Sequence, residues 1–257
     1  MVLLSGIPGT RHTAFQTELI WRALRRGEPA ATMSFTEPPT SVVNHFLRLD
    51  WNVLPYLETE QFHVVDCFTG RLDDPDAFYV HETEWSAFLR AVAGDAITEV
   101  GDPSNVTELS RKLDNSIESR NMAGTGMVTI DSIDELRSIV HEIQVEQFVR
   151  DVRGDLCKGQ FVPIVTSTTG TDQDEFPHNS GHLFDGVVDL KFDQDVVPET
   201  RLKRLGVRKM DGAAVVPQWL AYELTTNGLV SFDPTTETRS IYTDSHVRPP
   251  HSPSFQG

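Results

Sequence analysis

Residues 3–13 read LLSGIPGTRHT and place a glycine-containing loop between an apolar strand and a helical pattern. A strand, a loop and a helix in this order carry the phosphate-binding pattern G-x-x-x-x-G-K-[ST]. Four positions of the loop fall in place, namely Gly6, Pro8, Gly9 and Thr13. Because parallel sheets place ligands at the carboxyl ends of their strands, this segment predicts an α/β fold with a phosphate site at its first strand.

Two positions depart from that pattern, since Arg11 stands where the second glycine belongs and His12 stands where the lysine belongs. Histidine is shorter than lysine and mostly neutral near its ordinary pKa of about 6.5, so it gives a phosphate no fixed charge. Arginine is charged, but its Cβ disfavours a turn that suits glycine, and we expect a reshaped loop. A tight turn without a ligand is the alternative interpretation. The residues predicted to bind a nucleotide are Gly6, Pro8, Gly9, Thr10, Arg11, His12 and Thr13.

The composition limits the setting in which such a domain works. The 257 residues carry 22 basic and 38 acidic side chains, a net charge of −16, and only five of the basic residues are lysines. Salt screens the repulsion among so many carboxylates, so we infer a halophilic source. The chain has no long apolar run and no signal segment, which predicts a soluble, cytoplasmic protein without a membrane partner. No basic stripe is visible, which argues against nucleic acid as a partner.

Apolar strand-like runs alternate with helical patterns along the chain, and this alternation favours a mainly parallel sheet flanked by helices. We expect strands at residues 2–4, 30–35, 62–66, 127–130, 161–166 and 186–192. We expect helices at residues 14–26, 41–49 and 132–152. Antiparallel strands are expected at the C-terminal end of the sheet, at residues 202–210, 219–225 and 229–232.

One stretch, residues 68–126, is longer than a crossover between two strands needs. It contains helical patterns around residues 84–92 and 106–120, and we interpret it as a helical insertion or lid. The main domain is expected to span residues 1–233 with this insertion included. Residues 234–257 are rich in Pro, Thr, Ser and His and are expected to form a disordered tail.

Three side chains have the chemistry to complete a nucleotide site beside the loop. The hydroxyl of Thr13 and the carboxylate of Asp131, which follows the strand at 127–130, are the candidate ligands of a magnesium ion. Glu37 follows the second strand and is a candidate catalytic acid. Asp131 is also a good N-cap for the helix that follows, a role compatible with metal binding. A solvated strand end is the alternative for Glu37.

The order of the segments LLSGIPGT, SFTEPP, FHVVDCF, VTIDSIDEL and RLGVRKMDG resembles the KaiC-like branch of the RecA-superfamily P-loop ATPases, which includes many archaeal proteins. The resemblance spans residues 2–233 apart from 68–126. It implies a RecA-like P-loop NTPase core that binds ATP with Mg²⁺ between neighbouring subunits, and hence a homo-oligomer. It also implies that Asp131 is the Walker B aspartate and that Lys209 reaches toward a neighbour's γ-phosphate.

The chain departs from the family pattern at its catalytic positions. The resemblance implies a pair of glutamates after the second strand, of which only Glu37 is present, because Thr36 replaces the first. It implies an arginine in the late turn, where this chain has Asp211. Loss of an arginine finger alone can slow hydrolysis by about 10³-fold or more. These departures predict a pseudo-ATPase with weak or lost hydrolysis and a regulatory or signalling role.

Two alternatives stay open. Arg11 could take over from the missing lysine and support a slow but genuine ATPase. A nucleotide-free scaffold could instead use the fold and residues 68–126 to hold a protein partner.

Overall fold

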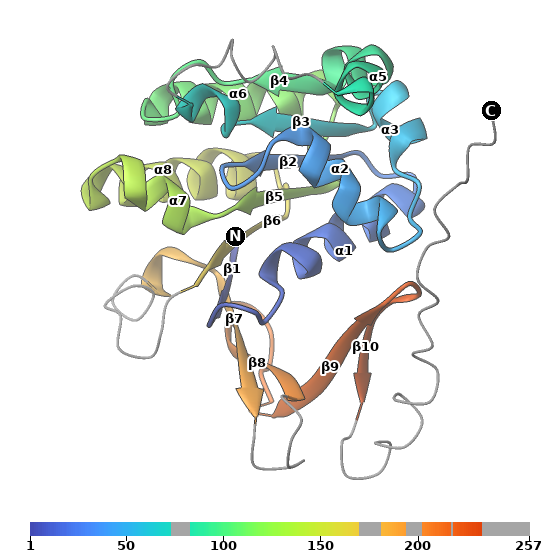
Figure 1. The fold of residues 1–257 in the computed structure, drawn as a ribbon. Helices are drawn as coiled ribbons and strands as arrows, with labels where there is room; N and C mark the ends of the chain where they lie inside the picture. The colour runs from blue at the N-terminus through green and yellow to red at the C-terminus, as the bar shows by residue number, and fades with distance from the viewer. Residues whose placement is uncertain (73–82, 170–180, 194–201, 217, 233–257) are drawn as a thin grey trace, which may run out of the picture.

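The computed structural model describes residues 1–72, 83–169, 181–193, 202–216 and 218–232. Its centre is a ten-stranded sheet with the order β10-β9-β8-β7-β1-β6-β5-β2-β3-β4 (Figure 1). The seven strands from β7 to β4 in this order run parallel, and β8, β9 and β10 continue the sheet in antiparallel fashion. The strands are β1 (Val2–Gly6), β2 (Ala30–Ser34), β3 (Phe62–Asp66), β4 (Ile97–Glu99), β5 (Met127–Asp131), β6 (Ile164–Thr168), β7 (Gly186–Asp193), β8 (Leu202–Met210), β9 (Trp219–Thr225) and β10 (Gly228–Phe232).

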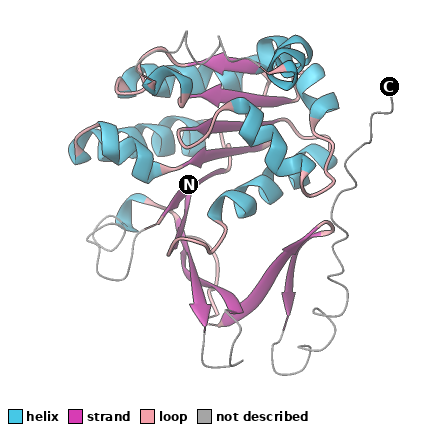
Figure 2. Cartoon of the chain, in the orientation of Figure 1, coloured by secondary structure: helices cyan, strands magenta, loops and turns pink. Residues whose placement is uncertain are grey.

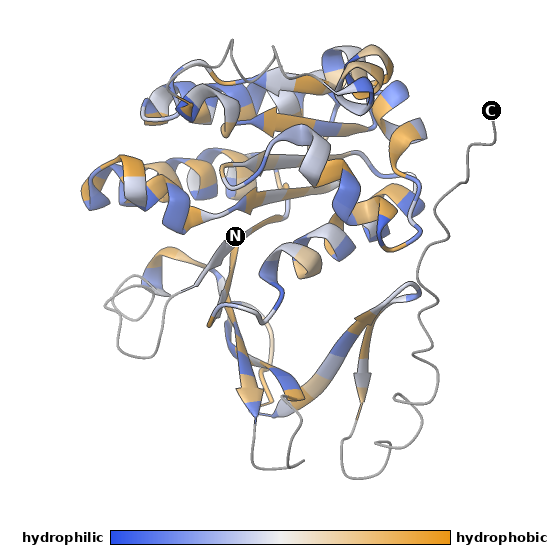
Figure 3. Cartoon of the chain, in the orientation of Figure 1, coloured by the Kyte–Doolittle hydropathy of each residue, from blue (hydrophilic) through white to orange (hydrophobic). Residues whose placement is uncertain are grey.

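The central strands are short and buried because helices cover both faces of the sheet (Figure 2). Every residue of β2, β3 and β6 is buried. Figure 3 shows hydrophobic residues along these strands and mixed faces on the helices. The strand β1 lies between β6 and β7, so the loop that follows it leaves from the middle of the sheet. The predicted mainly parallel sheet with antiparallel C-terminal strands is confirmed.

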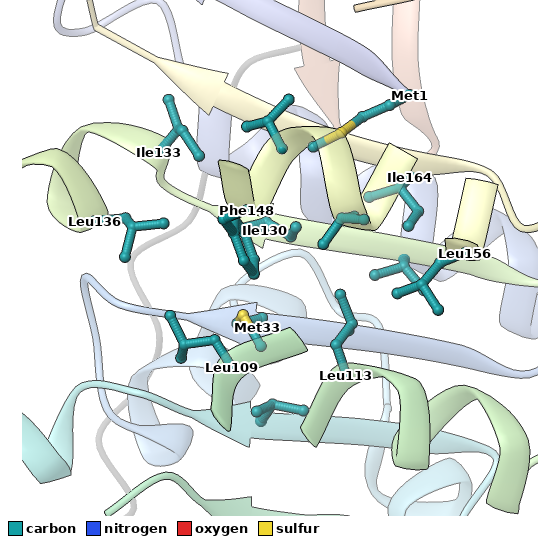
Figure 4. Packing of buried hydrophobic residues seen from close by; sticks show 14 of the residues in the cluster. Met1, Met33, Leu109, Leu113, Ile130, Ile133, Leu136, Phe148, Leu156 and Ile164 are labelled. Atoms are coloured by element: carbon teal, nitrogen blue, oxygen red, sulfur yellow. The ribbon is translucent and has the colours of Figure 1, made fainter. Parts of the chain in front are cut away.

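Two apolar cores lie on the two faces of the sheet. One core joins the strands to α6 (Val106–Ser119), α7 (Ile133–Ile139) and α8 (Glu142–Asp151), and Figure 4 shows Leu113 and Phe148 packing there. The other core joins the strands to α1 (His12–Arg25), α2 (Pro39–Leu47), α3 (Leu54–Glu58) and α5 (Glu84–Ala93). Within the described residues, no helix is long and apolar enough to cross a membrane.

The helix predicted at residues 132–152 is wrong as a single element. The chain is extended at Val140, with φ −131° and ψ 161°, and α8 starts one residue after His141. The apolar spacing continues across this break, so periodicity alone did not reveal it. A π-helical segment, η3 (Val152–Gly159), follows α8. The strand predicted at residues 161–166 is β6, and it starts three residues later, at Ile164.

Residues 68–126 contribute to the sheet itself. They contain the short helices η1 (Thr69–Arg71) and η2 (Gly94–Ala96) besides α5, α6 and β4. The strand β4 pairs in parallel with β3 and forms one edge of the sheet. The tail predicted at residues 234–257 lies outside the described residues.

The antiparallel end of the sheet bends toward α1 (Figure 1). Leu224 of β9 belongs to the same apolar core as Ile20 and Leu24 of α1. The indole Nε1 of Trp51 donates a hydrogen bond of 2.7 Å to the carbonyl oxygen of Thr226, in the turn between β9 and β10. This bend brings β9 beside the loop between β1 and α1.

Candidate phosphate-binding site

The loop between β1 and α1 is shaped by two glycines and one strained arginine. A Cβ at Gly6 would clash with the backbone oxygen of Leu190 on β7, so only glycine fits there. Gly9 has φ +90°, and Arg11 at the N-cap of α1 has φ 65° and ψ 46°. Arg11 thus adopts the left-handed conformation that glycine takes at lower cost. Its side chain makes no capping hydrogen bond, so it does not cap the N–H groups of the first helical turn, which can face an anion.

His12 points into the protein and does not replace the lysine in charge. Its side chain is 7% exposed, and Nε2 lies 3.4 Å from the hydroxyl of the buried Thr10. That hydroxyl donates a hydrogen bond to the carbonyl oxygen of Ile7 at 2.8 Å. Burial lowers the pKa of His12, although the nearby carboxylate of Asp134 opposes the shift. The imidazole is therefore neutral near pH 7 and stabilises the loop from inside.

The two residues predicted to bind magnesium, Thr13 and Asp131, lie in contact. The hydroxyl of Thr13 donates a hydrogen bond of 2.8 Å to Oδ2 of Asp131, and Ser167 donates one of 3.1 Å to Oδ1. Burial raises the pKa of Asp131, while these two hydrogen bonds oppose the rise. The prediction that Thr13 and Asp131 lie at the same edge of the sheet is confirmed. A threonine hydroxyl beside a carboxylate is a donor set that suits Mg²⁺.

A small cavity of about 30 Å³ lies next to this pair, enough for roughly one water molecule. Its lining includes Thr13, Gln16, Glu37, His45 and Asp131. The Oε1 atom of Gln16 is buried without a hydrogen-bond partner in the structure as described. A buried oxygen of this kind calls for a donor, a water molecule or an ion, and the cavity has room for one such group beside Thr13 and Asp131.

Glu37 lies at this cavity but is already engaged. Its Oε2 is 2.6 Å from Nε2 of His45 on α2, and this hydrogen bond lowers the pKa of the Glu37 carboxyl. The hydroxyl of Ser34 fixes the turn by donating to the carbonyl oxygen of Glu37 at 2.7 Å. Sequence reasoning missed His45, because no local pattern marks a histidine eight residues beyond an acid as its partner.

Lys209 lies away from this chain's own loop. Lys209 on β8 lies opposite Val187 on β7, and Val187 in turn lies opposite Leu3 on β1. The position is near the start of β1, whereas the loop follows its end at Gly6. The Lys209 amine donates to the carbonyl oxygen of Phe184 at 2.7 Å and lies 3.5 Å from the carboxylate of Asp211.

The strand β9 contacts the loop through two residues that sequence reasoning did not select. The hydroxyl of Tyr222 donates a hydrogen bond of 2.6 Å to the carbonyl oxygen of Thr10. Arg11 directs its guanidinium to Glu223, with 3.3 Å between Nη1 and Oε1. Both partners lie more than two hundred residues along the chain from the loop, so no local signal could have found them.

Comparisons with known proteins show the family and the fold of the chain. The family description "ATPase: KaiC" matches residues 1–236. A UPF0273 protein of Thermotoga maritima is 26% identical over 90% of this chain and 87% of its own length. Another, from Pyrococcus horikoshii, is 30% identical over 51% of this chain and 58% of its own length. A crystal structure of a KaiC-like protein from Pyrococcus horikoshii superimposes with a TM-score of 0.68 at 17% identity, covering 90% of this chain and 88% of that one.

Proposed function

This chain belongs to the KaiC family of ATPases, and we propose that it is a member whose nucleotide site binds ATP weakly and hydrolyses it poorly or not at all. The family binds ATP with Mg²⁺ on a RecA-like α/β core, which is the fold that the sheet order displays.

The single observation that carries the proposal is the orientation of the two residues that replace glycine and lysine. His12 is buried and neutral, and Arg11 is paired with Glu223. With Arg11 paired in this way, neither residue offers a free cation to the β- and γ-phosphates, as the P-loop lysine does in working members of this superfamily. Ground-state binding of the triphosphate should therefore be weak.

The catalytic positions point in the same direction. Thr36 cannot act as a base, and the remaining acid, Glu37, is held by His45 at 2.6 Å. In a ring of subunits, the turn that follows Lys209 would present Asp211 to a neighbour's phosphates, and its negative charge would repel them. The finger charge acts on the transition state, so its loss lowers turnover more than binding.

Specific contacts argue against the two alternatives, a nucleotide-free scaffold and a slow ATPase. A nucleotide-free scaffold gives no reason for the hydrogen bond between Thr13 and Asp131 or for the polar cavity beside them, and both support retained binding of Mg²⁺ with a nucleotide. A slow ATPase would need Arg11 to leave Glu223. We favour a cytoplasmic, regulatory role in a homo-oligomer or with a protein partner, in which nucleotide occupancy is the signal.

Calorimetric titration with Mg-ATP in molar KCl tests the proposal. We expect weak, magnesium-dependent binding, which Asp131→Asn should weaken further because it removes the metal's carboxylate. Tight binding that ignores magnesium and Asp131→Asn would contradict it. Melting temperature measured across KCl concentrations tests the halophilic origin, because screening of the carboxylates should raise it.

A further inference from the structure

Arg11 is held by a carboxylate that already has a better partner. Glu223 accepts a contact of 3.3 Å from Nη1 of Arg11 through Oε1, and one of 2.7 Å from the amine of Lys203 through Oε2. Arg11 is half exposed, at 50%, whereas Lys203 is only 14% exposed. The pair with Arg11 is thus the longer and more solvated of the two. When Arg11 leaves, Lys203 still neutralises Glu223, so its departure leaves no unpaired carboxylate.

The same strand fixes the loop at the neighbouring residue. Tyr222 is 2% exposed, and its hydroxyl donates to the carbonyl oxygen of Thr10, one residue before Arg11. On β7, the ring of Phe192 lies against Gly9, 3.4 Å from where a Cβ would be. The backbone of the loop is therefore held from two strands, whereas among the described residues the Arg11 side chain is held by one half-exposed ion pair. This division allows the guanidinium to move without the loop.

We propose that Glu223 is a positioning residue that keeps Arg11 turned away from the phosphate-binding loop, and that the polyphosphate of a magnesium-bound nucleoside triphosphate competes with it for the guanidinium. The inference rests on the proposed function, because it needs the loop to accept a nucleotide. The guanidinium supplies the charge that His12 lacks, and the arginine fork suits phosphate oxygens in two-point contact. Weak nucleotide binding in this chain is then partly the result of a competing carboxylate.

The test is a double-mutant cycle on the affinity for Mg-ATP, measured by calorimetry at one fixed KCl concentration. The four proteins are the wild type, E223Q, R11Q and R11Q/E223Q. Releasing a half-exposed ion pair should tighten binding of E223Q about two- to fivefold. In the R11Q background the same change should have a much smaller effect, because only the general field of one carboxylate is removed. The cycle therefore separates release of Arg11 from simple charge removal.

Two further variants keep the result decisive. E28Q removes a carboxylate that pairs with Arg26 at the far end of α1 and should leave the affinity unchanged. K203M leaves Glu223 to Arg11 alone and should weaken binding, again only while Arg11 is present. If the melting transition shows that E223Q does not fold, K203M replaces it in the test, and the expected change is then a weaker affinity for Mg-ATP.

The reversion R11G/H12K shows which of the two proposals has failed if the cycle is flat. Equal tightening by E223Q with and without Arg11, or none in either background, overturns the role of Glu223 while nucleotide binding by the wild type stands. Binding by R11G/H12K but by neither the wild type nor E223Q also overturns it. No binding by any of these proteins overturns the proposed nucleotide site and this inference with it.

Discussion

On the β5 side of the loop, Thr13 and Asp131 meet at 2.8 Å beside a small polar cavity, whereas on the β9 side Arg11 pairs with Glu223. The first side brings together the two side chains that we propose hold a magnesium ion. The second side has a positive charge that would suit a triphosphate, that of Arg11, but it is paired with the carboxylate of Glu223. We infer that metal binding and phosphate binding, which act together in a working P-loop, can be lost separately, because different elements of the fold supply the residues for each.

Repairing only the phosphate side is expected to have the largest effect. In R11G/H12K the loop regains its glycine and its lysine, and a charged hydrogen bond to phosphate typically contributes about 1.5–3 kcal/mol. Affinity for Mg-ATP should therefore rise about 10- to 100-fold, as measured by calorimetry. Turnover should rise much less, because Thr36 and Asp211 are unchanged. A variant that gains turnover as much as affinity would show that the catalytic positions are intact after all.

Acid should act on a part of the molecule away from both sides of the loop. Burial lowers the pKa of His63 to about 3, and its ring contacts the hydroxyls of Ser116 and Thr98. In the unfolded chain His63 takes up a proton near pH 6.5, whereas in the folded protein it does so only near pH 3. Its contribution to the free energy of unfolding is therefore fully present above pH 6.5 and is lost as the pH falls toward 3. The slope approaches about 1.4 kcal/mol per pH unit for this one group.

Denaturant unfolding of the wild type and of His63→Asn at several pH values measures that slope, which the variant should lack. Binding experiments on the loop are then best compared above pH 6.5, where His63 does not change charge. If the free energy of unfolding of the wild type does not change from pH 6.5 to 5, or changes as it does in the variant, then His63 does not cause the loss of stability in acid.

Loosening the loop from β9 should have a smaller effect. Tyr222→Phe removes the donor to the carbonyl oxygen of Thr10, and the loss of such a hydrogen bond costs about 1 kcal/mol of stability. The loop should also become less ordered, so affinity for Mg-ATP should fall modestly. The matched control is Tyr56→Phe, because that ring packs edge-on against Trp21 rather than against the loop. Equal melting temperatures for the two variants would argue against a fixing role for Tyr222.

The sheet was predictable from sequence because its strands are short apolar runs with a loop or helix between them. The pair of Thr13 and Asp131 was predictable for the same reason, since both follow strands whose carboxyl ends share an edge. The break before His141 was not, because an apolar stripe can pass from one helix to the next without losing its spacing.

The partners of the loop were also beyond sequence reasoning. Glu223 and Tyr222 reach it only because β9 bends toward α1, and that bend depends on packing of Leu224 and on the hydrogen bond from Trp51. His45 reaches Glu37 only through the angle at which α2 leaves the second strand. Such contacts follow from the tertiary fold and leave no periodic trace in the chain.

Magnesium-dependent ATP hydrolysis by the unmodified protein, compared with Thr13→Ala in the same molar KCl, tests most directly whether the metal side alone has survived. We predict no hydrolysis by the wild type above that of Thr13→Ala, because Arg11 is paired with Glu223 and the remaining acid, Glu37, is held by His45. Robust hydrolysis that needs magnesium and disappears in Thr13→Ala would contradict it and establish a working ATPase.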